Sequence, residues 1–429
     1  MKGINIEMYQ SIEIKNVYGL QVLDSRGKPT VQATVVLSDG SVGKASVPSG
    51  ASTGQYEAHE KRDGANEFSG KSVNVAIQSI NTEIKTALLE NQPKNIYSTD
   101  TLLCKLDGTP NKNRLGANAV LATSIAYAKA LAASQKLPLF AFLGGAQARL
   151  LPIPMMNILN GGAHADNTLD IQEFMIMPIG ASSFSHAIQI GCETYQALKT
   201  LLKDNGFSTA IGDEGGFAPD LKRNEDALML ICDAIELAGY QPGIDVSIAL
   251  DIAASEWYRN QTYYLPKQRI TKDQSELFSY YNTLCQAFPI VSIEDPFSDD
   301  DFEGFCKFTK AHGDIQTVGD DLFVTNPDRI RKGVAMNAAN AVLIKPNQIG
   351  TLSETLTAIS LAQEASYNTV ISHRSGDTDD SFIADLAVAT NAGQIKTGAP
   401  CRGERIAKYN RLLEIEAMLQ DNAIFGKFQ

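Results

Sequence analysis

Cysteine is scarce in this sequence. Six cysteines occur in 429 residues, and no two of them form a CxxC pair. A small secreted protein stabilised by disulfides needs many more cysteines per residue, and a zinc site built on thiolates needs paired ones. We therefore expect six reduced thiols in a cytoplasmic protein.

Long apolar runs are absent as well. The most apolar helical stretch, residues 117–133, is interrupted by Asn118, Lys129 and two hydroxyl residues and is too short to span a bilayer. The first 15 residues lack the continuous apolar core of a signal peptide. The sequence predicts no transmembrane segment and a cytoplasmic location, and it leaves open a secondary cell-surface or secreted pool that needs no signal peptide.

Positive charge is in deficit. There are 37 Lys and Arg against 49 Asp and Glu, which gives a net charge of −12. This balance argues against nucleic acid as the main partner, because phosphate binding needs a basic face, and against an anionic membrane surface. The 44% hydrophobic and 20% charged residues fit an ordinary globular protein.

The first region of the chain predicts an α+β domain. Apolar residues alternate over 12–17 and 31–37, and a Ser-Asp-Gly turn at 38–40 follows, which is typical of a β-meander. From residue 73 the apolar spacing becomes helical, and a second, alanine-rich helix is expected over 118–135. A turn-rich stretch at 143–154 predicts the boundary, so we expect domains at 1–143 and 144–429.

The second region predicts a (β/α)8 barrel. Short apolar runs alternate there with helical patterns, and a barrel typically needs about 250 residues. An open doubly wound sheet is the alternative; we favour the barrel because reactive residue types end nearly every run. The eight runs are 171–177, 209–211, 246–250, 290–293, 316–318, 341–344, 369–371 and 394–395.

Charged and imidazole side chains mark the ends of these runs. Any one of them could equally be a solvated loop charge, but six in consecutive units are expected to share one cavity at the C-terminal rim of a barrel. The residues are Glu173, Glu214, Asp251, Glu294, Asp320, Lys345, His373 and Lys396, and the last six lie 23 to 43 residues apart.

Three carboxylates from adjacent units predict a metal site. Asp251, Glu294 and Asp320 supply hard oxygen ligands, which suit magnesium or manganese. The competing interpretation is a set of helix N-caps, because Asp also caps well. Basic residues follow the carboxylates along the chain and indicate an anionic substrate.

Lys345 is the candidate general base. A lysine among other cations and a divalent metal loses affinity for its proton, although a structural ion pair with a strand-end carboxylate is the alternative. The other candidate substrate contacts are His373, Arg374, Ser375 and Lys396.

Three glycine-rich segments complete the pattern. Residues 49–54 lack the ending of a P-loop and are expected to be either an ordinary turn or a lid. Residues 160–164 and 212–216 place a polar side chain between glycines, which allow close backbone approach. For His164 alone, a hydrogen-bonded core histidine is the simpler interpretation.

Twelve motifs, spread over nearly the whole chain, resemble the enolases of glycolysis in order and spacing. They are DSRG at 24–27, VPSGASTG at 47–54, RDG at 62–64, LGANA at 115–119, NGGAHA at 160–165, QEFM at 172–175, GDEGG at 212–216, SIEDPF at 292–297, GDDL at 319–322, NQIGT at 347–351, SHRSG at 372–376 and QIKTG at 394–398.

The resemblance implies a small α+β cap domain on an enolase-type (β/α)8 TIM barrel whose first units are irregular. It implies the reversible dehydration of 2-phosphoglycerate to phosphoenolpyruvate by a magnesium-dependent lyase with two Mg²⁺ per active site.

The resemblance also implies a role for each candidate residue. Lys345 is then the base at carbon 2, and Glu214, supported by Glu173, is the acid at carbon 3. Asp251, Glu294 and Asp320 hold the first metal, Ser52 helps to hold the second, and the substrate contacts are His164, Glu173, His373, Arg374, Ser375 and Lys396.

Two further expectations follow from these roles. Neighbouring carboxyls should raise the pKa of Glu214, while the metal and Lys396 should lower the pKa of Lys345. Pro346 departs from the family pattern beside the base and removes a backbone donor, but we expect activity to survive.

The assembly and the competing functions stay open on sequence alone. The resemblance implies a homo-oligomer, either a dimer or an octamer. One alternative function is that of a superfamily relative acting on acid sugars, but residues such as His164 and Arg374 favour a phosphorylated substrate. Another is a binding protein without catalysis, against which the intact catalytic set argues.

Overall fold

A three-stranded antiparallel sheet opens the fold. The computed structural model describes residues 12–50, 54–64 and 66–428. The sheet has the order β1 (Ile14–Leu23), β2 (Pro29–Leu37) and β3 (Val42–Ser46). The predicted meander is confirmed, with the turn at 38–40 joining β2 to β3.

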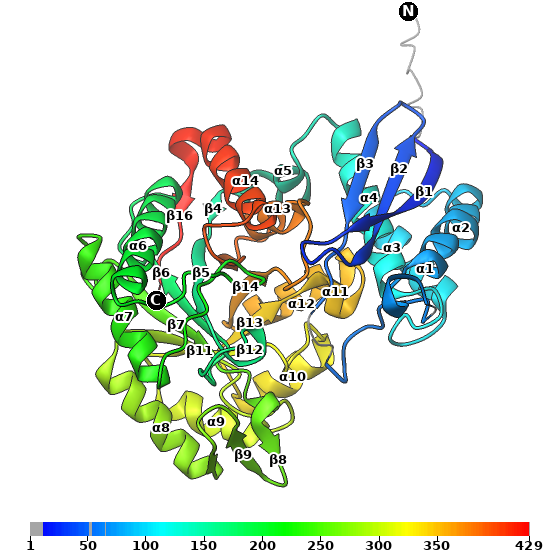
Figure 1. The fold of residues 1–429 in the computed structure, drawn as a ribbon. Helices are drawn as coiled ribbons and strands as arrows, with labels where there is room; N and C mark the ends of the chain where they lie inside the picture. The colour runs from blue at the N-terminus through cyan, green and yellow to red at the C-terminus, as the bar shows by residue number, and fades with distance from the viewer. Residues whose placement is uncertain (1–11, 51–53, 65, 429) are drawn as a thin grey trace, which may run out of the picture.

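Helices pack on this sheet (Figure 1). The longest, α4, is buried on nearly every side, as expected for a helix that is apolar all round. Its alanines permit close approach: a Cβ added to Gly43 on β3 would lie 2.0 Å from the Ala126 carbonyl oxygen. The helices are α1 (Asn74–Ser79), the π-helical turn η2 (Ile80–Ile84), α2 (Lys85–Asn91), α3 (Ile96–Asp107), α4 (Ala117–Ser134) and α5 (Leu139–Gly144).

Eight strands form a closed barrel in the second region, which confirms the predicted fold class. Their order around the barrel is β11-β12-β13-β14-β15-β5-β6-β7. The strands are β5 (Ile153–Asn160), β6 (Glu173–Met177), β7 (Ser247–Asp251), β11 (Ile290–Glu294), β12 (Gln316–Gly319), β13 (Ala341–Ile344), β14 (Asn368–Ser372) and β15 (Gly393–Lys396).

One strand prediction was wrong. Residues 209–211 are not a barrel strand; they lie in a loop with an isolated bridge from Ile211 to Phe217 and a hydrogen bond from the Ala218 N–H to the Ala210 carbonyl, and Ile211 is exposed. The true first strand is β5, which none of the eight predicted runs covers and whose first two residues fall in the turn-rich stretch at 143–154. Pro152 and Pro154 caused this error, because proline argues against a central strand.

The direction of β6 also departs from a regular barrel. This strand is antiparallel to both β5 and β7, whereas the other neighbouring strands are parallel. Glu173 therefore begins its strand instead of following it, yet it pairs with Asp251 at the end of β7. The reversal is the reason that Glu173 still reaches the rim where the other strands end.

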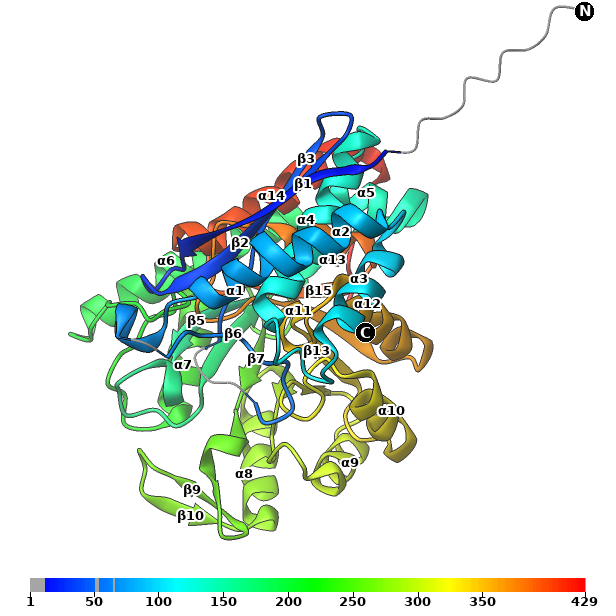
Figure 2. The same cartoon turned by 90° about the vertical axis from the view of Figure 1, so that its right-hand side faces the viewer.

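Helices surround the barrel, and a small sheet projects from it (Figure 2). The projecting strands are β8 (Tyr258–Arg259), β9 (Thr262–Leu265) and β10 (Ile270–Lys272). The helices are α6 (Phe184–Asp204), α7 (Asn224–Leu237), α8 (Gln274–Ala287), α9 (Phe302–Ala311), α10 (Pro327–Met336), α11 (Pro346–Ile349), α12 (Leu352–Glu364), α13 (Phe382–Ala389) and α14 (Gly403–Leu419).

Apolar side chains fill the interior of the barrel away from the rim. Met155, Met175 and Met177 pack there with Val318 and Leu343. The C-terminal segment closes this end: Phe428 packs on the same cluster, and β16 (Ile424–Phe425) pairs with β4 (Leu150–Leu151). The filled interior leaves the opposite rim as the place for a site.

The N-terminal region lies against the loops that follow β14. Ser49 pairs with Gly376 through backbone hydrogen bonds, and Lys129 forms an ion pair with Asp380 at 2.7 Å.

The domain boundary expected between residues 143 and 144 stays a prediction. Within the described residues, no helix is long and apolar enough to cross a membrane. All six cysteines are free, as expected.

Candidate active site

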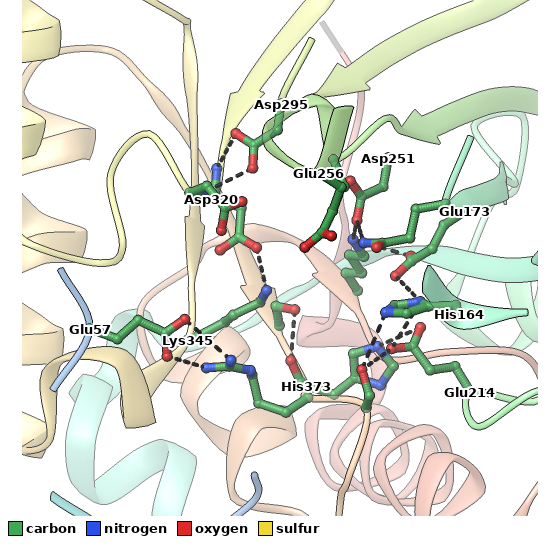
Figure 3. A pocket seen from close by; sticks show the side chains of 17 residues that line it. Glu57, His164, Glu173, Glu214, Asp251, Glu256, Asp295, Asp320, Lys345 and His373 are labelled. Atoms are coloured by element: carbon green, nitrogen blue, oxygen red, sulfur yellow. Dashed lines mark hydrogen bonds and ion pairs between the residues drawn. The ribbon is translucent and has the colours of Figure 1, made fainter. Parts of the chain in front are cut away.

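A pocket at the strand-end rim brings together most of the predicted side chains (Figure 3). We call it the rim pocket. It forms because each strand ends beside its neighbour, so the residue at each end faces the same cavity. The predicted residues that line it are His164, Glu173, Glu214, Asp251, Asp320, Lys345, His373, Arg374, Ser375 and Lys396. Glu294 is fully buried beside it, and Ser52 lies outside the described residues.

Lys396 is the centre of the carboxylate group. Its Nζ lies 2.9 Å from Asp251 Oδ2, 2.9 Å from Glu294 Oε2 and 3.1 Å from Glu173 Oε2. Burial disfavours the charge of Lys396, but the surrounding carboxylates raise its pKa well above the ordinary value. One buried ammonium thus compensates only part of the charge of three buried carboxylates.

Lys345 contacts Asp320 on the neighbouring part of the rim. Gln348 donates to the other Asp320 oxygen at 2.9 Å. Burial alone would lower the pKa of Lys345, but Asp320 outweighs it and raises that pKa. The lowered pKa expected for Lys345 depends on a bound metal and stays a prediction; in this structure the carboxylate expected to hold that metal pairs with the lysine ammonium.

Pro346 does not disturb this lysine. It occupies the first position of α11, where the backbone N–H of any residue would lack an intrahelical partner. Lys345 itself is extended, with φ −119° and ψ 103°, which is the conformation that a following proline favours. The proline thus fixes the strand-to-helix turn without loss of a hydrogen bond.

Glu214 lies on the other side of the rim pocket from Lys345 (Figure 3). It accepts hydrogen bonds from Ser375 Oγ at 3.0 Å and Asn157 Nδ2 at 3.0 Å. Burial would raise its pKa, but His164, His373 and Arg405 hold it well below its usual range. The expected raised pKa is therefore wrong for Glu214.

His164 and Glu173 complete this side of the pocket. The Nδ1 atom of His164 lies 3.3 Å from Glu173 and 3.8 Å from Glu214. Burial opposes protonation of His164, yet the two carboxylates raise its pKa to about 9. Burial and the Glu214 charge raise the pKa of Glu173 instead. His164 is thus part of the pocket and not a core histidine.

Arg374 reaches toward the N-terminal region. Its guanidinium forms a two-point ion pair with Glu57, at 2.9 and 3.3 Å, and donates to Asn347 Oδ1 at 3.2 Å. Glu57 also accepts from the backbone N–H of Gly54. The first region of the chain therefore contributes directly to the rim pocket.

The carboxylates of the rim can hold a cation. Burial and the neighbouring Asp251 charge raise the pKa of Glu294 well above its usual value, which shows that these oxygens need compensating positive charge. Among the described residues, the groups whose ligand atoms lie close enough to share one cation are Asp295, Asp320 and Asp321, and His164, Glu173 and Glu214. The predicted set of Asp251, Glu294 and Asp320 is not brought together in this way, because Asp251 and Glu294 contact Lys396. The donor oxygens fit magnesium better than a softer metal.

The sequence analysis missed Glu57 and Asp295, which line the pocket, and Asn157 and Arg405, which contact its lining residues. Asn157 lies on β5, the strand that was not predicted, and Glu57 follows a glycine-rich segment that could have indicated it. Asp295 directly follows Glu294 and binds the backbone N–H groups of Asp320 and Asp321. Arg405 lies in a helix that no motif connects to the pocket.

The comparisons with known proteins agree with this geometry. Residues 14–143 match the family described as the enolase N-terminal domain, and residues 148–428 match the enolase C-terminal TIM barrel domain. A protein named enolase from Acidothermus cellulolyticus is 55% identical over 414 residues, which cover 96% of each chain. The enolase of Tropheryma whipplei is 54% identical over 416 residues, covering 96% of this chain and 97% of that protein.

Proposed function

This chain belongs to the enolase family, lyases that interconvert 2-phosphoglycerate and phosphoenolpyruvate, and we propose that the rim pocket performs this reaction with magnesium. The observation that supports the proposal is the placement of Lys345 and Glu214 on opposite sides of one buried pocket (Figure 3). Dehydration needs a base at carbon 2 and an acid at carbon 3 of the same substrate.

The proposed metal ligands are Asp251, Glu294 and Asp320, with Ser52 joining a second site. These residues would hold a divalent ion, which would supply positive charge for the substrate carboxylate as it becomes an enolate; Asp320, shared between the ion and Lys345, would then hold the lysine ammonium less strongly. Lys345, when its ammonium is not held by Asp320, takes the proton from carbon 2. Lys396 keeps the carboxylates ordered and adds positive charge where the enolate develops.

The acid side delivers a proton to the leaving hydroxyl. Glu214 and Glu173 flank His164, whose raised pKa keeps a proton within this group at neutral pH. We propose that this proton reaches the hydroxyl through Glu214, with Glu173 in support. Arg374 and Ser375, with His373 beside them, bind the phosphate and the remaining substrate oxygens.

We propose the same assembly and location as the family resemblance implies. The protein is a cytoplasmic homo-oligomer, either a dimer or an octamer, that acts on a small-molecule substrate in glycolysis and gluconeogenesis. Multi-angle light scattering on the purified protein tests the assembly; a monomer at micromolar concentration would contradict it.

Two variants separate the proposed roles. Lys345→Ala should lower kcat by about 10²- to 10⁴-fold and abolish exchange of the carbon-2 proton with solvent deuterium. Glu214→Gln should lower dehydration to a similar extent but retain that exchange, because proton abstraction does not need the acid. Nuclear magnetic resonance of 2-phosphoglycerate in D₂O measures the exchange.

Lys199→Ala is the matched control, because Lys199 is exposed on α6 and outside the pocket. It should leave both the turnover and the exchange unchanged. Near-normal turnover in Lys345→Ala, or loss of exchange in Glu214→Gln with intact folding, would contradict the role assignment.

A further inference from the structure

Arg405 is a fully buried arginine behind the rim pocket. It lies in the first turn of α14 and has no exposed surface. Its guanidinium donates to the main-chain oxygens of Arg374 at 2.7 Å, Ser375 at 2.6 Å and Asp213 at 3.1 Å. It therefore ties the segment before Glu214 to the segment after β14.

Arg405 also lies 3.3 Å from Glu404 and 3.8 Å from Asp377, and its remaining hydrogen bond is with His373. Its Nη1 lies 2.6 Å from His373 Nδ1. A guanidinium can only donate hydrogen bonds, so Nδ1 must be the acceptor. In a neutral imidazole the proton then resides on Nε2.

Other features of His373 agree with a neutral ring. It is 2% exposed, and burial, assisted by the Arg405 charge, lowers its pKa to about 4 although Glu214 opposes the shift. Its Nε2 atom is buried and has no hydrogen-bond partner among the described residues. That atom lies 3.5 Å from Glu214 Oε2, inside the rim pocket.

We propose that Arg405 is a positioning residue that holds His373 as the Nε2–H tautomer, so that His373 offers one N–H to the pocket. This inference deepens the proposed function and, in its catalytic part, rests on it. His373 then acts as a hydrogen-bond donor to Glu214 and to a substrate oxygen, and it does not act as a base. The hydrogen bonds of Arg405 to Ser375 and Asp213 keep the donor and Glu214 at a fixed separation.

The tautomer can be measured without any substitution. The chain has five histidines, so two-bond ¹⁵N–¹H spectra of the ¹⁵N-histidine-labelled protein stay simple. The signal of His373 is identified by its loss in His373→Asn. We expect a protonated Nε2 and an unprotonated Nδ1 at pH 7. A protonated Nδ1, or a doubly protonated ring, would overturn the proposal.

Variants test the role of Arg405 itself. Arg405→Lys retains the charge but cannot reproduce the planar fork, and Arg405→Met removes both. We expect either variant to give a mixture of His373 tautomers and a kcat at least tenfold lower, with KM changed less than threefold. Exchange of the carbon-2 proton should be retained, because Lys345 is untouched.

Arg402→Met is the matched control. Arg402 precedes the same helix and donates to Glu404 and to the Ser25 carbonyl; it shares Glu404 with Arg405, but its side chain does not bond to the segments at 213 and 373–375 that Arg405 joins. It should leave the tautomer and kcat unchanged. A pure Nε2–H signal with unchanged kcat in folded Arg405→Lys would overturn the positioning role. A correct tautomer in a wild-type protein that does not turn over 2-phosphoglycerate would instead refute the proposed function.

Discussion

Individual side chains in the rim pocket have roles that depend on their neighbours as much as on their own type. Glu173 and Glu214 are both buried carboxyls, yet the pKa of the first is raised and that of the second is lowered. Two histidines and an arginine outweigh burial at Glu214, whereas at Glu173 burial and the Glu214 charge outweigh Lys396 and His164. The sequence shows both residues but does not show which one carries the charge.

Pro346 provides a test at the residue scale. Because it occupies the first position of α11, Pro346→Ala should leave kcat within about twofold of the wild type. It should lower the free energy of unfolding by about 0.4–1 kcal/mol, because the unfolded chain gains freedom. Steady-state kinetics and urea titration check both values. A tenfold change in kcat would show that the proline shapes the site after all.

Asp100 provides a pH-dependent test. It is buried at the contact between α3 and α12, where it accepts from the backbone N–H of Ser353 at 2.8 Å, and burial raises its pKa to about 6. The folded state therefore binds its proton more tightly than the unfolded state. The stability that this proton gives is fully present below about pH 4 and is lost as pH rises through about 6.

Asp100→Asn should remove this dependence while retaining an acceptor for Ser353. The free energy of unfolding of the variant, relative to the wild type, should rise by about 2 kcal/mol between pH 4 and pH 7, since each pKa unit corresponds to about 1.4 kcal/mol and part of the effect lies below pH 4. Urea titrations of both proteins across this range measure the difference. A difference that does not change with pH would contradict the assignment.

Residues at strand ends could be predicted because the sequence pattern places them there. Asp251, Glu294 and Lys396 end β7, β11 and β15, as the runs indicated. Arg405 and Glu57 could not be predicted in this way, because their partners lie about 30 and more than 300 residues away. Such contacts depend on how the helices and strands pack against one another, and the apolar spacing within one helix or strand does not indicate that packing.

At the scale of elements, the strands and helices follow local patterns except where proline or strand direction intervenes. The meander and α4 were predicted from alternation and from alanine content. β5 was missed because of Pro152 and Pro154, and the reversal of β6 has no local signature. The loop at 209–211 shows the converse error, because the short run Thr-Ala-Ile resembles a strand but pairs with no barrel strand.

The contact between β3 and α4 gives a test at this scale. Gly43→Ala places a Cβ against backbone atoms, 2.0 Å from Ala126 O and 2.3 Å from Ala130 N, which cannot move aside like a side chain. We expect a loss of about 3 kcal/mol or more in unfolding free energy. Gly313→Ala, where nothing lies within 4 Å, should cost far less. Equal losses in the two variants would argue against close packing here.

At the scale of the whole molecule, the N-terminal region and the barrel together form the rim pocket. The barrel supplies the strand-end residues, and the N-terminal region supplies Glu57, which pairs with Arg374. The excess of acidic residues in the barrel rim matches the need for a divalent cation. The central claim is therefore that this rim converts 2-phosphoglycerate only when metal compensates its carboxylates.

The most direct measurement is the ultraviolet absorbance of the enol double bond after 2-phosphoglycerate is added to the full-length protein with magnesium. We predict a rise in absorbance that stops when a chelator is added and resumes when excess magnesium restores the metal. No rise in folded, magnesium-loaded protein, or a rise unaffected by the chelator, would contradict the account.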